Sequence, residues 1–169
     1  MKAISLFSGA GGMDIGFERA GFEVVVAVEQ DSSCCETLRK NRPNTVVIND
    51  DITKVTTKQI LDAGGLSAGE VDVVLGGPPC QPWSLAGDRG GLDDPKGRLL
   101  MEFNRVIREA LPKAFVMENV SGLASWGGGR ALRMVLEEFS KPIGEHSYVV
   151  TSSVLDAYDY GLQIGRAHV

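Results

Sequence analysis

The chain has 169 residues, the length of one domain and enough to bury a substantial core. With 43% apolar and 23% charged residues, its composition excludes a collagen, a coiled coil and a wholly disordered protein. No apolar run approaches the roughly 20 residues of a membrane helix, and the net charge of −5 argues mildly against a basic nucleic-acid-binding face.

Short β-prone apolar runs alternate with stretches of helical periodicity along the chain. We expect strands at Ala3–Phe7, Val24–Val28, Thr45–Ile48, Val71–Leu75, Ala114–Met117 and Tyr148–Leu155. We expect helices at Met13–Ala20, Ser32–Asn41, Thr57–Ala63, Arg98–Ala110 and Arg130–Phe139. This order predicts an α/β fold in which a mostly parallel sheet carries helices on both faces.

The three cysteines are Cys34, Cys35 and Cys80. Two are adjacent and the third is remote, so neither zinc-type spacing nor a disulfide framework is present. This cysteine usage fits a reducing compartment and no metal site. The apolar start of the chain is too short for a signal peptide, so we expect a cytoplasmic protein with no membrane segment. Cys34 and Cys35 fall in a helical stretch and are interpreted as packing residues.

Chemically active residues follow each of the first five expected strands. They are Ser8-Gly9, Glu29, Asp50-Asp51, Pro78-Pro79-Cys80 and Glu118-Asn119. Ligands of parallel sheets bind outside the carboxyl ends of the strands. The functional site is therefore expected at that edge of the sheet.

The turn Phe7–Asp14 is rich in glycine and leads into a helix, so its N–H groups suit an anionic group. It departs from the dinucleotide fingerprint because Asp14 occupies the place of the third glycine, where a carboxylate would repel a diphosphate. Glu29 is placed for ribose hydroxyls and Asp51 for an adenine amino group. This set favours an adenosine ligand without a diphosphate; the alternative is a glycine-rich turn beside two surface acids.

Cys80 follows two prolines, which stiffen the turn and direct the thiol outward. Glu118 ends a buried strand, so we expect it to be poorly solvated and able to donate a proton near neutrality. A Cys–His hydrolase is the obvious rival. It is disfavoured because His146 and His168 both lie away from strand ends.

The chain resembles the N-terminal half of the cytosine-C5 DNA methyltransferases over residues 1–162. The matching stretches are Phe7–Gly12 with Gly16-Phe17, Glu29–Asp31, Asp51-Ile52, Gly77–Ser84, Asp94–Gly97, Glu118–Leu123 and Asp159–Gly161. The Pro-Pro-Cys-Gln-Pro and Glu-Asn-Val sequences are the most specific of these.

This resemblance implies a Rossmann-like methyltransferase sheet in the order 3-2-1-4-5, truncated at its C-terminus, with S-adenosylmethionine as cofactor. Phe7 would stack on the adenine, Glu29 would bind the ribose and Asp51 the amino group. The other pocket residues implied are Gly9, Ala10, Gly12, Gln30, Ile52, Pro79 and Leu99.

The resemblance also implies methyl transfer to C5 of a cytosine flipped out of double-stranded DNA. Cys80 would attack C6 while Glu118 acts on N3, and Asn119 is grouped with these catalytic residues. The expected protein is a monomer of a prokaryotic or phage cytoplasm, in a restriction–modification setting. An RNA (tRNA) cytosine-C5 methylase and an adenosine-binding module without catalysis remain open as alternatives.

In this family an antiparallel strand, absent here, lies between the fifth strand and Tyr148–Leu155. We therefore expect that segment to be separated from Ala114–Met117 or to pair with it abnormally. Residues 1–162 are interpreted as a partial catalytic domain, inactive alone. Residues 163–169 match the translated start of a widely used sequencing adapter and are interpreted as read-through; a divergent natural terminus is the alternative.

Overall fold

A computed structural model describes residues 1–79 and 97–161. The strands are β1 Lys2–Leu6, β2 Glu23–Glu29, β3 Val46–Asn49, β4 Val73–Gly76 and β5 Ala114–Met117. The α-helices are α1 Gly12–Arg19, α2 Ser32–Asn41, α3 Thr57–Ala63, α4 Gly97–Ala110, α5 Gly122–Ser125 and α6 Arg130–Phe139. Short 3-10 helices are η1 Ile52–Lys54, η4 Trp126–Gly129 and η5 Ala157–Tyr160.

The strands form one parallel sheet in the order β3-β2-β1-β4-β5, as predicted. Each connection between neighbouring parallel strands passes through a helix or a long crossover, which is what a parallel ladder requires. The order reverses direction between β1 and β4. Such a reversal is where ligands of open α/β sheets bind.

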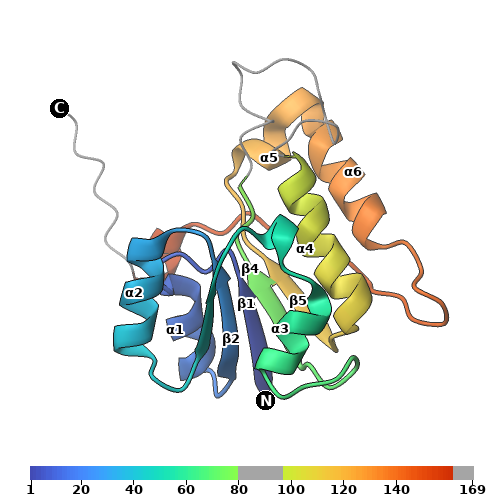
Figure 1. Ribbon diagram of the computed structural model, residues 1–169. Helices are drawn as coiled ribbons and strands as arrows, with labels where there is room; N and C mark the ends of the chain where they lie inside the picture. Colours follow the sequence, from blue (N-terminus) through green and yellow to red (C-terminus); the bar gives the residue numbers. More distant parts are fainter. Residues whose placement is uncertain (80–96, 162–169) are drawn as a thin grey trace.

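Helices cover both faces of the sheet, with α1 and α2 on one side and α3, α4 and α6 on the other (Figure 1). The alternation of side chains along each strand divides the apolar residues between two cores. Ile4 and Leu6 of β1 join the larger core with Phe103 of α4, whereas Ala3 joins the smaller core against Phe17 of α1. The expected α/β architecture is therefore confirmed.

The sixth expected strand, Tyr148–Leu155, is wrong, because this segment forms no strand. Its first residue is anchored, because the Tyr148 hydroxyl donates to the Pro112 carbonyl at 2.6 Å and its ring meets Phe115 edge-on at 5.2 Å. Val150 also packs against the larger core. A groove of about 910 Å³ lies between β5 and the segment. Within residues 1–79 and 97–161 no strand pairs with this segment, and it forms no ladder with β5, in line with the expectation that it would be separated or pair abnormally.

Asp14, which takes the place of the third glycine of a dinucleotide fingerprint, is buried in the first turn of α1. Its Oδ1 accepts a hydrogen bond from Ser5 Oγ of β1 at 2.6 Å, while Oδ2 has no partner among the described residues. Burial raises the pKa of Asp14 above its usual value, and the Ser5 hydrogen bond and the Arg42 charge oppose that rise.

This burial predicts a pH-dependent effect of Asp14→Asn. Because the pKa of Asp14 is higher in the folded state, the folded protein holds the Asp14 proton more tightly than the unfolded chain does. This adds to the free energy of unfolding at pH values below the unperturbed pKa of 3.8, and the contribution is lost as the pH rises through the folded pKa. As the pH rises above 3.8, the free energy of unfolding of the wild type should therefore fall relative to that of Asp14→Asn, which has no proton to lose at this position. Urea denaturation at a series of pH values measures this.

The matched control is Asp62→Asn, which removes an exposed carboxylate that pairs with Lys58 on the surface of α3. Its difference from the wild type should be small throughout. An Asp14→Asn difference that stays constant from acid to neutral pH would contradict the account.

Candidate functional site

The carboxyl ends of all five strands meet at one edge of the sheet. The register pairs Glu29 of β2 with Asn49 of β3, Leu6 of β1 with Gly76 of β4, and Gly76 with Met117 of β5. The loops that leave these strands therefore emerge side by side, at the upper edge of the sheet in Figure 1. The described candidate residues lie in these loops or at the start of the elements that follow them.

The glycine-rich turn after β1 has a left-handed backbone at Phe7 (φ 53°), Gly9 (φ 53°) and Gly11 (φ 86°). A left-handed residue other than glycine is uncommon, and such strain gathers at ligand sites. A Cβ built on Gly9 or Gly12 meets nothing within 4 Å, so space is open beside the turn. Helix α1 has no side-chain cap, which leaves first-turn N–H groups as donors for an anionic group.

Glu29 ties the end of β2 to this turn. One carboxylate oxygen accepts from the Gly9 N–H at 2.8 Å and the other from the Asp31 N–H at 2.8 Å. Each oxygen keeps a further lone pair, so Glu29 can hold the turn and still accept from a ligand hydroxyl. Gln30 beside it is exposed.

Asn49 supports Glu29 from the neighbouring strand, a role that sequence reasoning missed. Its amide nitrogen donates to the carbonyls of Glu29 at 3.2 Å and Gln30 at 3.0 Å. Asn49 ends β3, so the rule that selected the strand-end acids could have selected it too. Its contacts fix the main chain from which the Glu29 carboxylate projects.

Arg42, at the end of α2, holds the glycine-rich turn in place. Sequence reasoning gave this residue no role. The buried guanidinium donates to the Gly11 carbonyl at 3.0 Å and to Glu18 of α1 at 2.8 Å. A Cβ on Gly11 would lie 2.4 Å from Arg42 Nη1. Gly11 is therefore required both by its positive φ and by this close approach.

Asp51 caps the short helix η1 after β3. Its Oδ1 accepts from the Thr53 N–H at 2.9 Å, and this hydrogen bond lowers the pKa of Asp51 below its usual value. The carboxylate is half-buried and ionised at neutral pH, as an acceptor for an amino group must be. Ile52, which follows it, is buried in the core.

Two glycines let the ends of β4 and β5 approach each other. A Cβ on Gly76 would lie 2.2 Å from the Leu6 carbonyl oxygen of β1, a contact that no side chain tolerates. A Cβ on Gly77 would lie 3.1 Å from Glu118 Oε2, so the Glu118 carboxylate sits directly over Gly77. The turn after β4 and the acid after β5 are thus brought together.

Asn119 ties these two loops to each other. Its side-chain nitrogen donates to the Pro78 carbonyl at 3.0 Å, and its side-chain oxygen accepts from the Val120 N–H at 2.9 Å. It therefore positions the turn that leads to Cys80. Cys80 itself lies outside the described residues, so its placement beside Glu118 stays a prediction.

Glu118 is exposed, so the expectation that it is poorly solvated is wrong for this structure. The reason is that β5 is an edge strand, and no further strand of the described sheet covers its end. The other expected pocket residues vary in exposure: Ala10 and Pro79 are exposed and Leu99 is half-buried.

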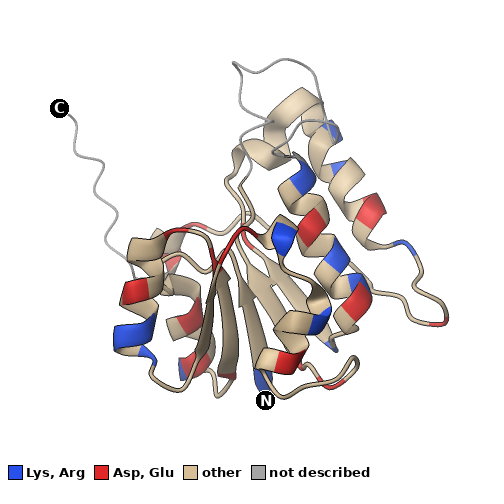
Figure 2. Ribbon diagram, in the orientation of Figure 1, with Lys and Arg blue, Asp and Glu red and all other residues tan. Residues whose placement is uncertain are grey.

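Acidic residues gather in the loops at this edge, as Figure 2 shows above β2 and β3. They include Glu29, Asp31, Asp50 and Asp51. Lys54 lies near them, 3.9 Å from Asp50 in an exposed pair. This balance favours a ligand with a positive group over one that carries several phosphates. In residues 1–79 and 97–161, no helix is both long and apolar enough to cross a membrane.

The glycine geometry predicts a contrast between Gly76→Ala and Gly77→Ala. Gly76→Ala forces a methyl group against backbone and should cost about 1–3 kcal/mol or more of stability. Among the described residues, a methyl group on Gly77 lies 3.1 Å from the end of the Glu118 side chain and in ordinary contact with the Glu118 carbonyl at 3.8 Å, so Gly77→Ala should fold almost normally and displace that carboxylate. Urea unfolding compares the two variants, and equal losses of stability would contradict this geometry.

Comparisons with known proteins show the family of the chain. A family model described as "C-5 cytosine-specific DNA methylase" matches residues 1–167. The chain is 57% identical to type II methyltransferase M.AquIA of Picosynechococcus sp., covering 99% of this chain and 69% of that protein. It is 41% identical to type II methyltransferase M.FnuDI of Fusobacterium nucleatum, covering 100% of this chain and 45% of that one.

Solved structures show the same fold. A crystal structure described as a prophage-encoded DNA modification methyltransferase (E. coli) superposes with a TM-score of 0.67 at 31% identity, covering 83% of this chain and 38% of that one. The S. pombe Dnmt2 methyltransferase shares the fold with a TM-score of 0.61 at 23% identity. The chain thus spans less than half of the prophage protein and of M.FnuDI. It belongs to the C-5 cytosine-specific DNA methylase family.

Proposed function

We propose that this protein transfers a methyl group from S-adenosylmethionine to C5 of cytosine in double-stranded DNA. One observation carries the proposal: at a single sheet edge, Glu29 is bonded to a strained glycine-rich turn while Glu118 and Asn119 are held against the turn before Cys80. This supports a site in which an adenosine-binding half lies next to the turn that precedes Cys80. Family membership gives this pairing its chemistry.

The described residues fit this cofactor. S-adenosylmethionine supplies an electrophilic methyl group on a positively charged sulfonium, and it carries no phosphate. Glu29 has lone pairs left for the ribose hydroxyls, and ionised Asp51 accepts from the adenine amino group. The uncapped first turn of α1 suits a carboxylate. We assign the pocket lining to Phe7, Gly9, Ala10, Gly12, Gln30, Ile52, Pro79 and Leu99.

The proposed chemistry begins with a bond between the Cys80 thiolate and C6 of the cytosine. Glu118 gives a proton or hydrogen bond to N3, so the ring can hold the added electron pair and C5 becomes nucleophilic. After C5 gains the methyl group, a base removes the C5 proton and the Cys80–C6 bond breaks. Asn119 serves by fixing the Pro78 turn that positions the thiol.

The first test is Cys80→Ser in the full gene product. An alcohol is far less ionised than a thiol at neutral pH, so transfer of tritiated methyl groups to a cytosine-containing duplex should fall to background. Binding of S-adenosylmethionine should persist, because the thiol is not among the cofactor contacts. Near-normal methylation by Cys80→Ser would overturn the covalent mechanism.

The second test separates cofactor binding from chemistry with Glu29→Ala. Loss of hydrogen bonds to a charged group should weaken S-adenosylmethionine binding by about 1.5–3 kcal/mol in calorimetric titration. Glu36→Ala is the matched control, because Glu36 is an exposed acid on α2. Equal affinities for the two variants would remove Glu29 from the cofactor site.

A further inference from the structure

Arg105 joins α4 to the segment that follows Asp51. Its half-buried guanidinium donates through Nη2 to the Ile52 carbonyl at 3.2 Å and the Val55 carbonyl at 2.9 Å. Nη1 donates to Thr57 Oγ1 at 3.0 Å. One side chain therefore binds both ends of η1 and the start of α3.

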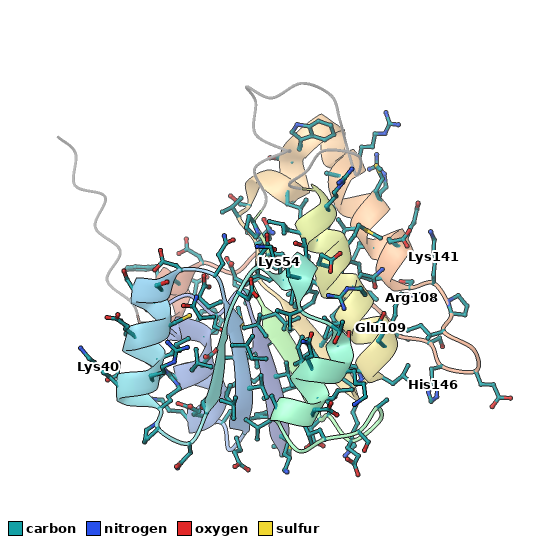
Figure 3. The ribbon with its side chains drawn as sticks, in the orientation of Figure 1. Lys40, Lys54, Arg108, Glu109, Lys141 and His146 are labelled. Carbon is teal, nitrogen blue, oxygen red and sulfur yellow. The ribbon has the colours of Figure 1, made fainter. Side chains whose placement is uncertain are left out.

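Two carboxylates of α4 hold this guanidinium in place. Arg105 Nε donates to Glu102 at 2.6 Å, and Nη1 lies 3.4 Å from Glu109. A planar guanidinium held on one edge presents its remaining donors in a fixed direction, which an ammonium group does not. Figure 3 shows Glu109 on α4 and Lys54 on η1, the two elements that Arg105 connects.

The segment η1 needs such support, because it is a single short turn. A 3-10 helix of this length leaves carbonyl groups unsatisfied, and its hydrogen-bond geometry is poor. Two of its hydrogen bonds run back to Asp51: the Lys54 N–H donates to the Asp51 carbonyl and the Thr53 N–H to the Asp51 carboxylate, each at 2.9 Å. The conformation of η1 therefore sets the direction of the Asp51 carboxylate.

We propose that Arg105 is a positioning residue for the adenine end of the cofactor site. By fixing η1 it holds the Asp51 carboxylate where the adenine amino group binds. This inference rests on the proposed function, because it takes the cofactor to be an adenosine compound. Arg105 acts through the main chain of η1 and makes no contact with the ligand in this account.

The helix offers a matched control in Arg108, three residues further along α4. Its guanidinium also donates to two main-chain carbonyls, those of Lys141 at 3.3 Å and Pro142 at 3.1 Å. In Figure 3, Lys141 and Lys54 lie on opposite sides of α4. Arg108→Gln thus removes the same kind of contact from the same helix, away from η1.

The experiment compares binding of S-adenosylhomocysteine and S-inosylhomocysteine, which differ in the amino group that Asp51 is proposed to recognise. Calorimetry gives the ratio of the two dissociation constants for the full gene product and for each of its variants. Asp51→Ala should abolish the wild-type preference for the adenine compound. Arg105→Gln should reduce that preference roughly tenfold, the scale of one hydrogen bond to a charged group. Arg108→Gln should keep it.

Each outcome decides between the claims. If Asp51→Ala leaves the preference intact, the adenine assignment in the proposed function fails. If Asp51→Ala removes it but Arg105→Gln weakens both ligands equally, Arg105 is only structural and the inference is overturned.

If Arg105→Gln fails to fold, Arg105→Lys is the second variant to test. Lysine keeps the positive charge but lacks the planar guanidinium that donates to several carbonyls at once. Hydrogen exchange in this variant should quicken at residues 52–55 and stay unchanged at residues 9–12. Unchanged exchange at residues 52–55, or unfolding of this variant as well, would overturn the positioning role.

Discussion

The site depends on the hydrogen bonds of the Glu29 carboxylate. The sheet places the ends of β1 and β2 near each other, and this carboxylate links them. Its hydrogen bond to the Gly9 N–H holds the turn after β1 against the end of β2. Arg42 secures the same turn through the Gly11 carbonyl, and Asn49 secures the main chain of Glu29. The open space beside Gly9 therefore lies next to a turn whose conformation is already fixed. Such a turn needs little reorganisation when it binds a ligand.

The two ends of β4 and β5 follow a different constraint, which is the close approach of main chains. Gly76 permits β4 to lie against the Leu6 carbonyl, and Gly77 leaves room for the Glu118 carboxylate. Asn119 then bonds across to the Pro78 carbonyl. Because β5 is the edge of the described sheet, Glu118 keeps its exposure, which leaves it accessible to the cytosine that we propose it acts on.

Much of the fold could be predicted from the sequence, because strand and helix periods alternate and parallel connections permit few topologies. The acids at strand ends were found by the same reasoning. Arg42 and Arg105 were not, because each reaches partners 24 to 53 residues away in the chain, and no local pattern encodes such a contact. Tyr148–Leu155 has the residues of a strand, yet a strand also needs a neighbour to share its hydrogen bonds.

The central claim is most directly tested by trapping the enzyme on a duplex that contains 5-fluorocytosine. Fluorine cannot leave C5 as a proton does, so a methylated base stays bonded through C6 to the attacking thiol. Mass spectrometry of the full gene product, incubated with this duplex and S-adenosylmethionine, should find the adduct on the peptide that contains Cys80. An adduct on another residue, or no adduct while ordinary cytosine is methylated, would contradict the account.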